Sequence, residues 1–279
     1  MRVLVTGAGG QLGAELLRAF ARHDVVGCDR AALDVGDRDS VLAAICSTEP
    51  DAIVHAAACT NVDGCETDPD LAFRVNALGT RHVAEAARLV GARVCYVSTD
   101  YVFDGTAAEP YTEWSPPSPR SVYGRSKLAG EHELGPGHTV VRTSWVFGEH
   151  GHNIVKTILR LADQQDTLRF VDDQVGHPTE ASDLAGMIER LVVGRRPGTF
   201  HVTNQGAVSW HGFARAVLDA AGHDPDRVEA IATADLDPPR PAPRPANSVL
   251  DNAALRLSGI ELLPDFRTPL ARVVGALRS

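Results

Sequence analysis

The chain has 279 residues, of which 44% are hydrophobic and 23% charged, an ordinary balance for a globular protein with a sizeable core. Its formal net charge is −9, from 27 basic and 36 acidic residues, which argues against non-specific binding to nucleic acid or anionic membranes. No apolar run is long enough for a membrane span or a signal peptide, and five cysteines form no CxxC pair, so we expect free thiols and a cytoplasmic location.

The first half of the chain predicts a parallel sheet covered by helices on both faces. Apolar, β-branched runs indicate strands at 2–8, 24–29, 51–58, 92–100 and 138–148. Helical patterns alternate with them, at 11–23, 40–50 and 69–91. Pro69 and Gly91 suit the two ends of the last helix. Repeated strand–helix units of this length are typical of an α/β fold.

The second half predicts a smaller region with a looser alternation. Helical patterns lie at 153–164, 181–193 and 209–222, and short strand patterns at 167–171 and 199–203. Five prolines between 238 and 245 exclude regular structure from 235–248, where we expect an ordered surface loop rather than a disordered linker. The predicted fold is α/β: a Rossmann-type doubly wound parallel sheet at 1–148, which later segments rejoin, and a smaller C-terminal α/β substrate-binding region at 149–279.

A glycine-rich turn, TGAGGQLG, lies between the first strand and the first helix and contains Gly7, Gly10 and Gly13. Glycines at this spacing let the backbone approach a pyrophosphate, and the helix N-terminus offers free N–H donors with a partial positive charge. A turn without a ligand is the plainer alternative. The position at the start of a βαβ unit favours a dinucleotide, so we predict a site for NADPH or NADH.

Charged residues after the second strand leave the choice between these two dinucleotides open. Asp29 stands 22 residues after Gly7, where an acid binds the adenosine ribose hydroxyls and repels a 2′-phosphate. Arg30 follows at once and would attract that phosphate. Asp34 would either reach the adenine amino group or begin a helix.

Polar residues follow the fourth strand at the edge where open parallel sheets bind ligands. This strand ends in VSTD, which places Ser98, Thr99 and Asp100 there. Tyr123 and Lys127 come later, four positions apart, so both side chains share one helix face. An exposed contact between neighbouring helical turns is the alternative to a catalytic couple.

The chemistry of the Tyr123–Lys127 pair suits the reduction of a ketone, which needs a hydride on carbon and a proton on oxygen. A nearby ammonium favours phenolate, so we expect Lys127 to lower the pKa of Tyr123 from its usual value of about 10. Tyr123 would then act as the general acid. Lys127 would also hold the nicotinamide ribose, and Thr99 would hydrogen-bond the carbonyl oxygen.

Several segments match a known group of proteins over nearly the whole chain. They are GAGGQLG, AAACTNVDGCETDP, VNALGT, VSTDYVFDG, YGRSKLAGE, VRTSWVFG, DDQVGHPT, SWHGFA and RPANSVL. With them the chain resembles the extended short-chain dehydrogenase/reductase superfamily and, within it, the dTDP-4-dehydrorhamnose reductase family. GAGGQLG and YGRSKLAGE are common to the superfamily, whereas STDYVFDG, RTSWVFG and DQVGHPT are more specific. The resemblance implies reduction of the 4-keto group of a dTDP-4-keto-6-deoxyhexose by NADPH or NADH, giving dTDP-L-rhamnose.

The resemblance also implies roles for particular residues. The catalytic set would be Thr99, Tyr123 and Lys127. Asp100 and Trp145 would contact the sugar, with the indole packed against it. Asn153 and the run 244–248, which begins with Arg244, would contact the nucleotide diphosphate, because Arg suits that group. Taken alone, Trp145 would be a core aromatic and Arg244 a solvated loop charge.

The cofactor-binding residues are expected in the glycine turn, after the second and third strands, and on the helix of Tyr123. They are Gly7, Gly10, Gln11, Leu12, Gly13, Asp29, Arg30, Asp34, Val35, Ala56, Ala57, Ala58, Tyr123 and Lys127. We predict no metal ligands. Some members of this family dimerise around magnesium held by glutamates, and Glu15 stands where one such ligand would be, but the others have no match here. A homodimer is nevertheless an expected assembly.

Four other functions are alternatives to this one. A dehydratase would carry Glu after Asp100, where this chain has Tyr101, and RTSWVFG does not suit an epimerase. The intact Tyr123–Lys127 pair disfavours a non-catalytic nucleotide-binding regulatory protein. A related dTDP-4-keto-6-deoxysugar reductase of secondary metabolism would carry the same motifs, so it stays an alternative.

Overall fold

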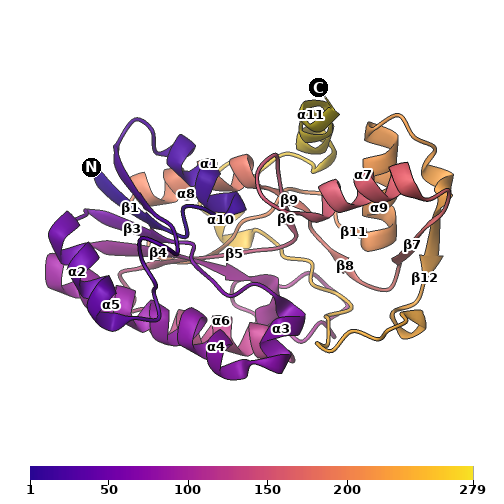
Figure 1. The fold of residues 1–279 in the computed structure, drawn as a ribbon. Coiled ribbons are helices and arrows are strands. Elements are labelled where there is room, and N and C mark those ends of the chain that lie inside the picture. The colour runs from indigo at the N-terminus through magenta and orange to yellow at the C-terminus, as the bar shows by residue number, and fades with distance from the viewer. Residues whose placement is uncertain (279) are drawn as a thin grey trace.

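The computed structural model describes residues 1–278, which form two lobes, on the left and the right of Figure 1. The larger lobe is built on a six-stranded parallel sheet with the strand order β10-β5-β4-β3-β1-β2. Its strands are β1 (Arg2–Thr6), β2 (Asp24–Cys28), β3 (Ala52–His55), β4 (Arg93–Thr99), β5 (Thr139–Thr143) and β10 (Gly198–His201). The predicted doubly wound parallel sheet is therefore confirmed.

Helices cover both faces of this sheet. Its helices are α1 (Gln11–Ala19), α2 (Arg38–Thr48), α3 (Val62–Thr67), α4 (Pro69–Phe73), α5 (Gly79–Val90), α6 (Val122–His132), α8 (Ala181–Val193) and α10 (Ala253–Leu257). Side chains alternate between the faces of a strand. Val3 and Val5 of β1 accordingly pack toward α1 and α8, whereas Leu4 packs toward α2 and α5.

The strand order places a crevice at one edge of the sheet. β1 pairs with β2 on one side and with β3 on the other, so the chain crosses back over β1 between β2 and β3. At such a reversal the loops after neighbouring strands leave toward opposite faces, and a ligand can enter between them. The carboxyl ends of β1 and β3 therefore mark the expected binding edge.

The helix predicted at 69–91 is interrupted near its middle. α4 is followed by a π-helical turn at Arg74–Leu78 and then by α5, which ends at Gly91 in the left-handed conformation (φ 71°). The π turn contains Asn76, whose side chain is fully buried. Such turns inside α-helices are rare and frequently occur at functional sites.

The smaller lobe contains the segments drawn on the right of Figure 1. Its elements, together with the short strands that join it to the sheet, are β6 (Val146–Phe147), α7 (Ile154–Gln164), β7 (Leu168–Val171), β8 (Val175–Gly176), β9 (Thr179–Glu180), β11 (Val208–Ser209), α9 (Trp210–Ala220), β12 (Val228–Ile231) and α11 (Arg267–Arg278). Its own apolar core lies between α7, α9, α11 and β7, around Ile158, Phe213 and Val273. The smaller C-terminal α/β region is thus confirmed. α8, β10 and α10 lie against the large sheet although they follow residue 148, and the domain boundary there stays a prediction.

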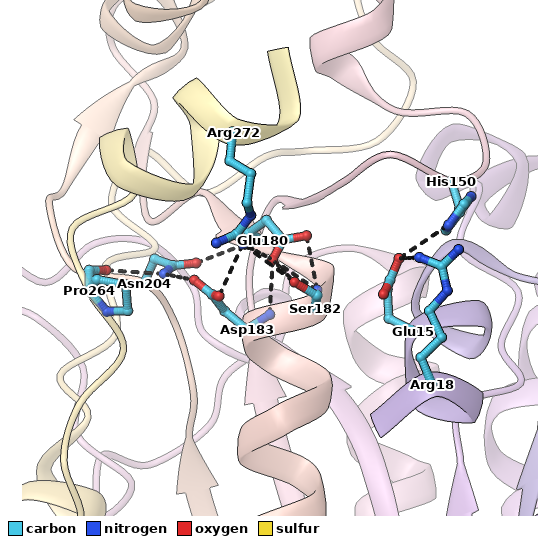
Figure 2. A network of polar contacts seen from close by, with 9 residues as sticks. All are labelled: Glu15, Arg18, His150, Glu180, Ser182, Asp183, Asn204, Pro264 and Arg272. Atoms are coloured by element: carbon cyan, nitrogen blue, oxygen red, sulfur yellow. Dashed lines mark hydrogen bonds and ion pairs between the residues drawn. The ribbon is translucent and has the colours of Figure 1, made fainter. Parts of the chain in front are cut away.

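A network of polar side chains around the buried Glu180 and Asn204 ties the lobes together (Figure 2). The Glu180 carboxylate accepts hydrogen bonds from the backbone N–H groups of Ser182 and Asp183 and so caps α8. Arg272 of α11 lies 3.2 Å from Glu180 and 3.3 Å from Asp183. Asn204 accepts from the Glu180 N–H and donates to the Asp183 carboxylate. The last helix is thereby fixed to a helix of the large lobe.

The proline-rich segment 235–248 is an ordered loop, as predicted. Its Ala242 N–H and Arg244 guanidinium bond to Asp63 of α3, and the Asn247 N–H bonds to the Gly105 carbonyl. These partners lie more than a hundred residues away in sequence, which explains why the loop keeps one path without regular structure. Among the helices of residues 1–278, none combines the length and the apolar character needed to cross a bilayer.

Candidate active site

A cleft of about 770 Å³ opens at the carboxyl ends of β1, β3 and β4. It runs from the glycine turn to the loop that begins at Trp145. Most residues predicted to bind cofactor or substrate line it: Gly7, Gly10, Gln11, Leu12, Gly13, Arg30, Asp34, Val35, Ala56, Ala57, Ala58, Thr99, Asp100, Tyr123, Lys127 and Trp145. Asp29, Asn153 and Arg244 are absent from this lining.

The glycine turn packs its backbone against itself and against β3. Gly7 has φ 72°, and a Cβ on it would lie 2.7 Å from the Ala57 nitrogen. A Cβ on Gly13 would lie 2.2 Å from the Gly7 carbonyl oxygen. Gly10 precedes α1 without any side-chain cap, and no acid stands in the first turn of that helix. The free N–H groups at this end of α1 therefore face the cleft without a competing carboxylate, as a phosphate requires.

The two charged residues after β2 have different surroundings. Asp29 turns one carboxylate oxygen back to the N–H groups of Ala31 and Ala32, at 3.0 and 2.9 Å, and does not line the cleft. Arg30 does line it. Asp34 accepts from the Gly36 N–H at 2.9 Å and also lines the cleft, so it is part of a turn rather than of a helix start.

Tyr123 and Lys127 lie on the cleft side of α6. Ser121 caps this helix through the Gly124 N–H, which fixes where its first turn begins. The Lys127 ammonium donates to the Val97 carbonyl at 2.7 Å and lies 4.0 Å from the centre of the Tyr96 ring. The pair is not the exposed surface contact of the alternative interpretation, because Lys127 is only 2% exposed.

Thr99 and Asp100 stand opposite α6 at the end of β4. The Thr99 hydroxyl donates to Asp100 Oδ1 at 2.9 Å, and burial raises the pKa of Asp100 to about 6. Asp100 Oδ2 is buried and has no hydrogen-bond partner within residues 1–278. An unpaired buried oxygen is costly, so this atom is suited to a ligand that donates to it.

The comparisons with known proteins agree with this geometry. The family described as the RmlD substrate binding domain matches residues 1–279. A dTDP-4-dehydrorhamnose reductase of Aggregatibacter actinomycetemcomitans is 43% identical, over 90% of each chain. The chain belongs to this reductase family.

Two further proteins are similar to this RmlD-family chain over nearly its whole length. A probable dTDP-4,6-dihydroxy-2-methyloxan-3-one 4-ketoreductase of Streptomyces antibioticus is 40% identical, over 97% of this chain and 93% of its own. The crystal structure of a dTDP-4-dehydrorhamnose reductase of Bacillus anthracis in complex with NADP superposes with a TM-score of 0.94, at 38% identity and 99% coverage of both chains.

The pKa of Tyr123 in the reductase is shifted in the opposite direction to the one that we expected. Burial raises the pKa of Tyr123, and the opposing hydrogen bond with Thr99 does not reverse this. Burial is the largest cause of this shift, and the Lys127 ammonium donates its hydrogen bond to the Val97 carbonyl. Burial also lowers the pKa of Lys127 to about 7, against the attraction of Glu131. The expected lowering of the Tyr123 pKa by Lys127 is therefore not found, and Tyr123 remains a phenol.

The sequence did not predict a buried ion pair that lies one helical turn from Lys127. Glu131, one turn further along α6, accepts three hydrogen bonds from Arg142 of β5, of 3.0, 3.3 and 2.7 Å. It also accepts from the Ser98 hydroxyl. Both side chains of the pair are 6% exposed. YGRSKLAGE and VRTSWVFG each contain one partner, but nothing in their spacing joins them.

Trp145 stands at the far end of the cleft with a strained backbone. Its φ of 46° is unusual for a bulky residue, and such strain concentrates at functional sites. Its indole stacks on Trp210, with ring centres 3.6 Å apart and planes 10° apart. A Cβ on Gly176 would lie 2.8 Å from the Trp145 ring, which accounts for the glycine in DQVGHPT.

Two predicted substrate residues are engaged elsewhere. The Asn153 side chain caps α7 through the Lys156 N–H and donates to the Gly148 carbonyl. Asn153 therefore has a structural role at the start of α7, and its contact with the diphosphate stays a prediction. Arg244 pairs with Asp63 through two hydrogen bonds, of 3.0 and 2.8 Å, so it is not a solvated loop charge. Its contact with the diphosphate stays a prediction.

Asn76 is a site residue whose role the sequence did not reveal, although VNALGT contains it. Its side chain accepts from the Cys59 N–H at 2.8 Å, donates to the Cys59 carbonyl at 3.1 Å and donates to Ser126 of α6 at 2.9 Å. One buried amide therefore joins the loop after β3 to the helix of Tyr123.

Glu15 is buried beside two basic side chains (Figure 2). Its carboxylate lies 3.4 Å from Arg18 and 3.4 Å from His150. His150 belongs to the loop whose Gly151 lies against Gln11 and lines the cleft. Glu15 thus lies between α1 and this loop rather than standing free on the surface.

Proposed function

We propose that this RmlD-family chain reduces the 4-keto group of dTDP-4-dehydro-L-rhamnose to give dTDP-L-rhamnose, with NADPH or NADH as the reductant. One observation carries the proposal: Thr99, Tyr123 and Lys127 meet in a cleft that continues to a glycine turn with free helix N–H groups. Residues 1–148 would bind mainly the cofactor, and residues 149–279 mainly the substrate.

The residues present suit a dinucleotide. The turn from Gly7 to Gly13 would hold the pyrophosphate, because any side chain on Gly13 would fill the space between the turn and α1. The loop at 56–58 would lie along the nicotinamide ribose. When bound, the dinucleotide supplies the hydride, and Lys127 would donate hydrogen bonds to its ribose.

The side chains of α6 and β4 would handle the proton. Tyr123 is a phenol over the whole neutral range because its pKa is raised, so it can donate its proton to the developing alkoxide. Lys127 in its ammonium form would stabilise the phenolate that remains. Thr99 would hydrogen-bond the same oxygen and orient the carbonyl.

Asp100 and Trp145 would position the sugar. The unpaired Oδ2 of Asp100 would accept a hydrogen bond from a sugar hydroxyl. The Trp145 indole would pack against the ring from the other end of the cleft. For Arg244 to reach the diphosphate, it would have to leave Asp63, so its contact with the nucleotide would require movement of the proline-rich loop.

The position of Arg30 favours NADPH. Arg30 lines the cleft, whereas the carboxylate of Asp29 is held by its own turn. A guanidinium facing the ribose would bind the 2′-phosphate. The B. anthracis structure was solved with NADP, which is consistent with this choice.

A second candidate is the reduction of a related dTDP-4-keto-deoxysugar. It is supported by the 40% identity to the probable 4-ketoreductase of S. antibioticus. The same catalytic residues would serve, because only the presentation of the sugar ring to the nicotinamide distinguishes the products.

The test is a product assay with dTDP-4-dehydro-L-rhamnose, run separately with NADPH and NADH. We expect oxidation of the cofactor, faster with NADPH, and dTDP-L-rhamnose by NMR. Turnover of other dTDP-4-keto-deoxysugars alone would favour the second candidate. Cofactor binding without turnover of any keto-sugar nucleotide would contradict both.

A further inference from the structure

Two cysteine side chains touch each other in the wall of the cleft. The sulfur atoms of Cys59 and Cys65 are 3.7 Å apart. Cys59 is half-buried and lines the cleft, whereas Cys65 of α3 is fully buried. All five cysteines are free thiols. Within residues 1–278, the sulfur–sulfur contact is the one between Cys59 and Cys65.

The contact is held by the fold rather than by flexible side chains alone. The Asn76 amide fixes the Cys59 peptide at both its N–H and its carbonyl. Cys65 lies in a helix capped by Asn61, and its sulfur also approaches the Cys59 carbonyl at 3.8 Å. A disulfide needs the sulfurs at about 2.0 Å, so side-chain rotation with a small backbone adjustment would join them.

We propose that Cys59 and Cys65 are a reversible oxidation site, which a hydroperoxide converts to a disulfide and which thereby disables the cleft beside Tyr123. Disulfides in reducing surroundings are typically transient and redox-sensing, and an exposed thiol next to a resolving cysteine is the usual arrangement. Two cysteines six residues apart match no known motif. The sequence alone therefore predicts only that both are free thiols.

The chemistry has two balanced steps. The Cys59 thiolate attacks the hydroperoxide, the O–O bond breaks, and Cys59 becomes a sulfenic acid. The leaving oxygen takes a proton from solvent and departs as an alcohol, or as water when the oxidant is hydrogen peroxide. The Cys65 sulfur then attacks the Cys59 sulfur, and the sulfenic hydroxyl leaves as water with the Cys65 proton. The two thiols are oxidised by two electrons, and the hydroperoxide is reduced. Burial raises the pKa of Cys65 to about 12, so Cys59, which also faces the cleft, reacts first.

The bond would act on the candidate active site through packing. Cys59, Cys65 and Tyr123 belong to one apolar cluster with Ala72 and Val122. Pulling the two sulfurs together would move Cys59 within the cluster against which Tyr123 packs and shift the 56–58 loop that precedes it. We therefore expect loss of reduction together with weaker dinucleotide binding. The effect on reduction rests on the proposed function, whereas formation of the bond does not.

The bond is tested by treating the protein with hydrogen peroxide, blocking free thiols with iodoacetamide and cleaving before aspartate. Cleavage then separates Cys46, Cys59 and Cys65 into peptides 39–50, 51–62 and 63–67. We expect 51–62 joined to 63–67, released by dithiothreitol, while 39–50 carries its own modification. Recovery of 51–62 and 63–67 unjoined, whether alkylated or over-oxidised, would overturn the proposal.

Matched variants test the consequence. Cys46→Ser, at an exposed cysteine, is the control. On oxidation it should form the Cys59–Cys65 bond and lose dinucleotide affinity, as the unaltered chain does. Cys65→Ser and Cys59→Ala should keep their affinity after the same treatment, and either variant alone suffices if the other fails to fold. A bond that forms without changing dinucleotide affinity or rate would refute the disabling effect. A chain that never turns over substrate would refute only the proposed function, because bond formation and dinucleotide affinity are measured without it.

Discussion

The glycine-turn end of the cleft is made of main chain and small side chains, whereas the opposite end is made of large and charged side chains from distant parts of the sequence. Gly7 and Gly13 act through the absence of a side chain. Tyr123 and Trp145 act through what their side chains present. Gly7 and Gly13 at the first end leave no room for a Cβ, and we expect this end to bind the phosphates. We expect the second end to set the chemistry and the choice of substrate.

The largest effect is expected at the main-chain end. Gly13→Ala would place a Cβ 2.2 Å from the Gly7 carbonyl oxygen, so the turn must move, and overpacking of this kind costs about 1–3 kcal/mol or more. We expect loss of dinucleotide binding by calorimetric titration. Gly186→Ala is the control, because that position in α8 has open space around it. Unchanged affinity in Gly13→Ala would show that the main-chain end is not the phosphate site.

The next effect is expected at the side-chain end. Tyr123→Phe should keep dinucleotide affinity and lower the rate of keto-sugar reduction by about 10²–10⁴-fold, because it removes the proton donor. Tyr111→Phe is its control: that phenol bonds to Asp104 and does not line the cleft. A rate within error of the unaltered enzyme would assign the proton to another group.

The ion pair of Glu131 and Arg142 supports the side-chain end from behind. The folded-state pKa of Lys127 is lowered to about 7, so its ammonium is lost as pH rises through this value, and kcat/KM for the dinucleotide should fall above it. Glu131 raises that pKa, so Glu131→Gln should move the fall to lower pH. Removing one partner of a buried pair should also cost about 3–5 kcal/mol of stability.

Glu133→Gln is the matched control for this experiment. Glu133 pairs with Arg81 at the surface, two residues beyond Glu131. We expect it to leave the pH profile in place and to change stability by less than about 1 kcal/mol in urea unfolding. If both variants showed the same profile, Glu131 would be structural only.

The smallest effect is expected at the outer rim of the main-chain end. Arg30→Ala should raise KM for NADPH several-fold and leave KM for NADH nearly unchanged, because only NADPH carries the 2′-phosphate. Arg22→Ala removes the same charge from an exposed position outside the cleft lining and should affect neither. Equal effects on the two cofactors would mean that Arg30 does not recognise the phosphate.

The same division explains what the sequence could predict. The strands of the large sheet and the helices α1, α2, α7, α8 and α9 followed from local apolar periods, whereas β12 was not predicted. The glycine turn and the Tyr123–Lys127 pair each lie within a few residues, so their geometry is set locally. Glu131 and Arg142 lie on different elements, and only the sheet register brings Arg142 beside Ser98. The diphosphate contacts of Asn153 and Arg244 stay predictions. The cap that Asn153 makes on α7 suits its residue type, whereas the pairing of Arg244 with Asp63, 181 residues away, depends on the fold.

The stacked indoles of Trp145 and Trp210 give this protein a built-in optical reporter. The chain has only three tryptophans, and the third, Trp114, is 67% exposed. Two parallel indoles in contact couple their electronic transitions and produce a circular dichroism signal in the near ultraviolet that a solvated indole lacks. Trp145 lines the cleft, while Trp210 begins α9 of the smaller lobe. Binding of a sugar at Trp145, or a shift of the smaller lobe, would therefore change the near-ultraviolet circular dichroism of the unlabelled protein.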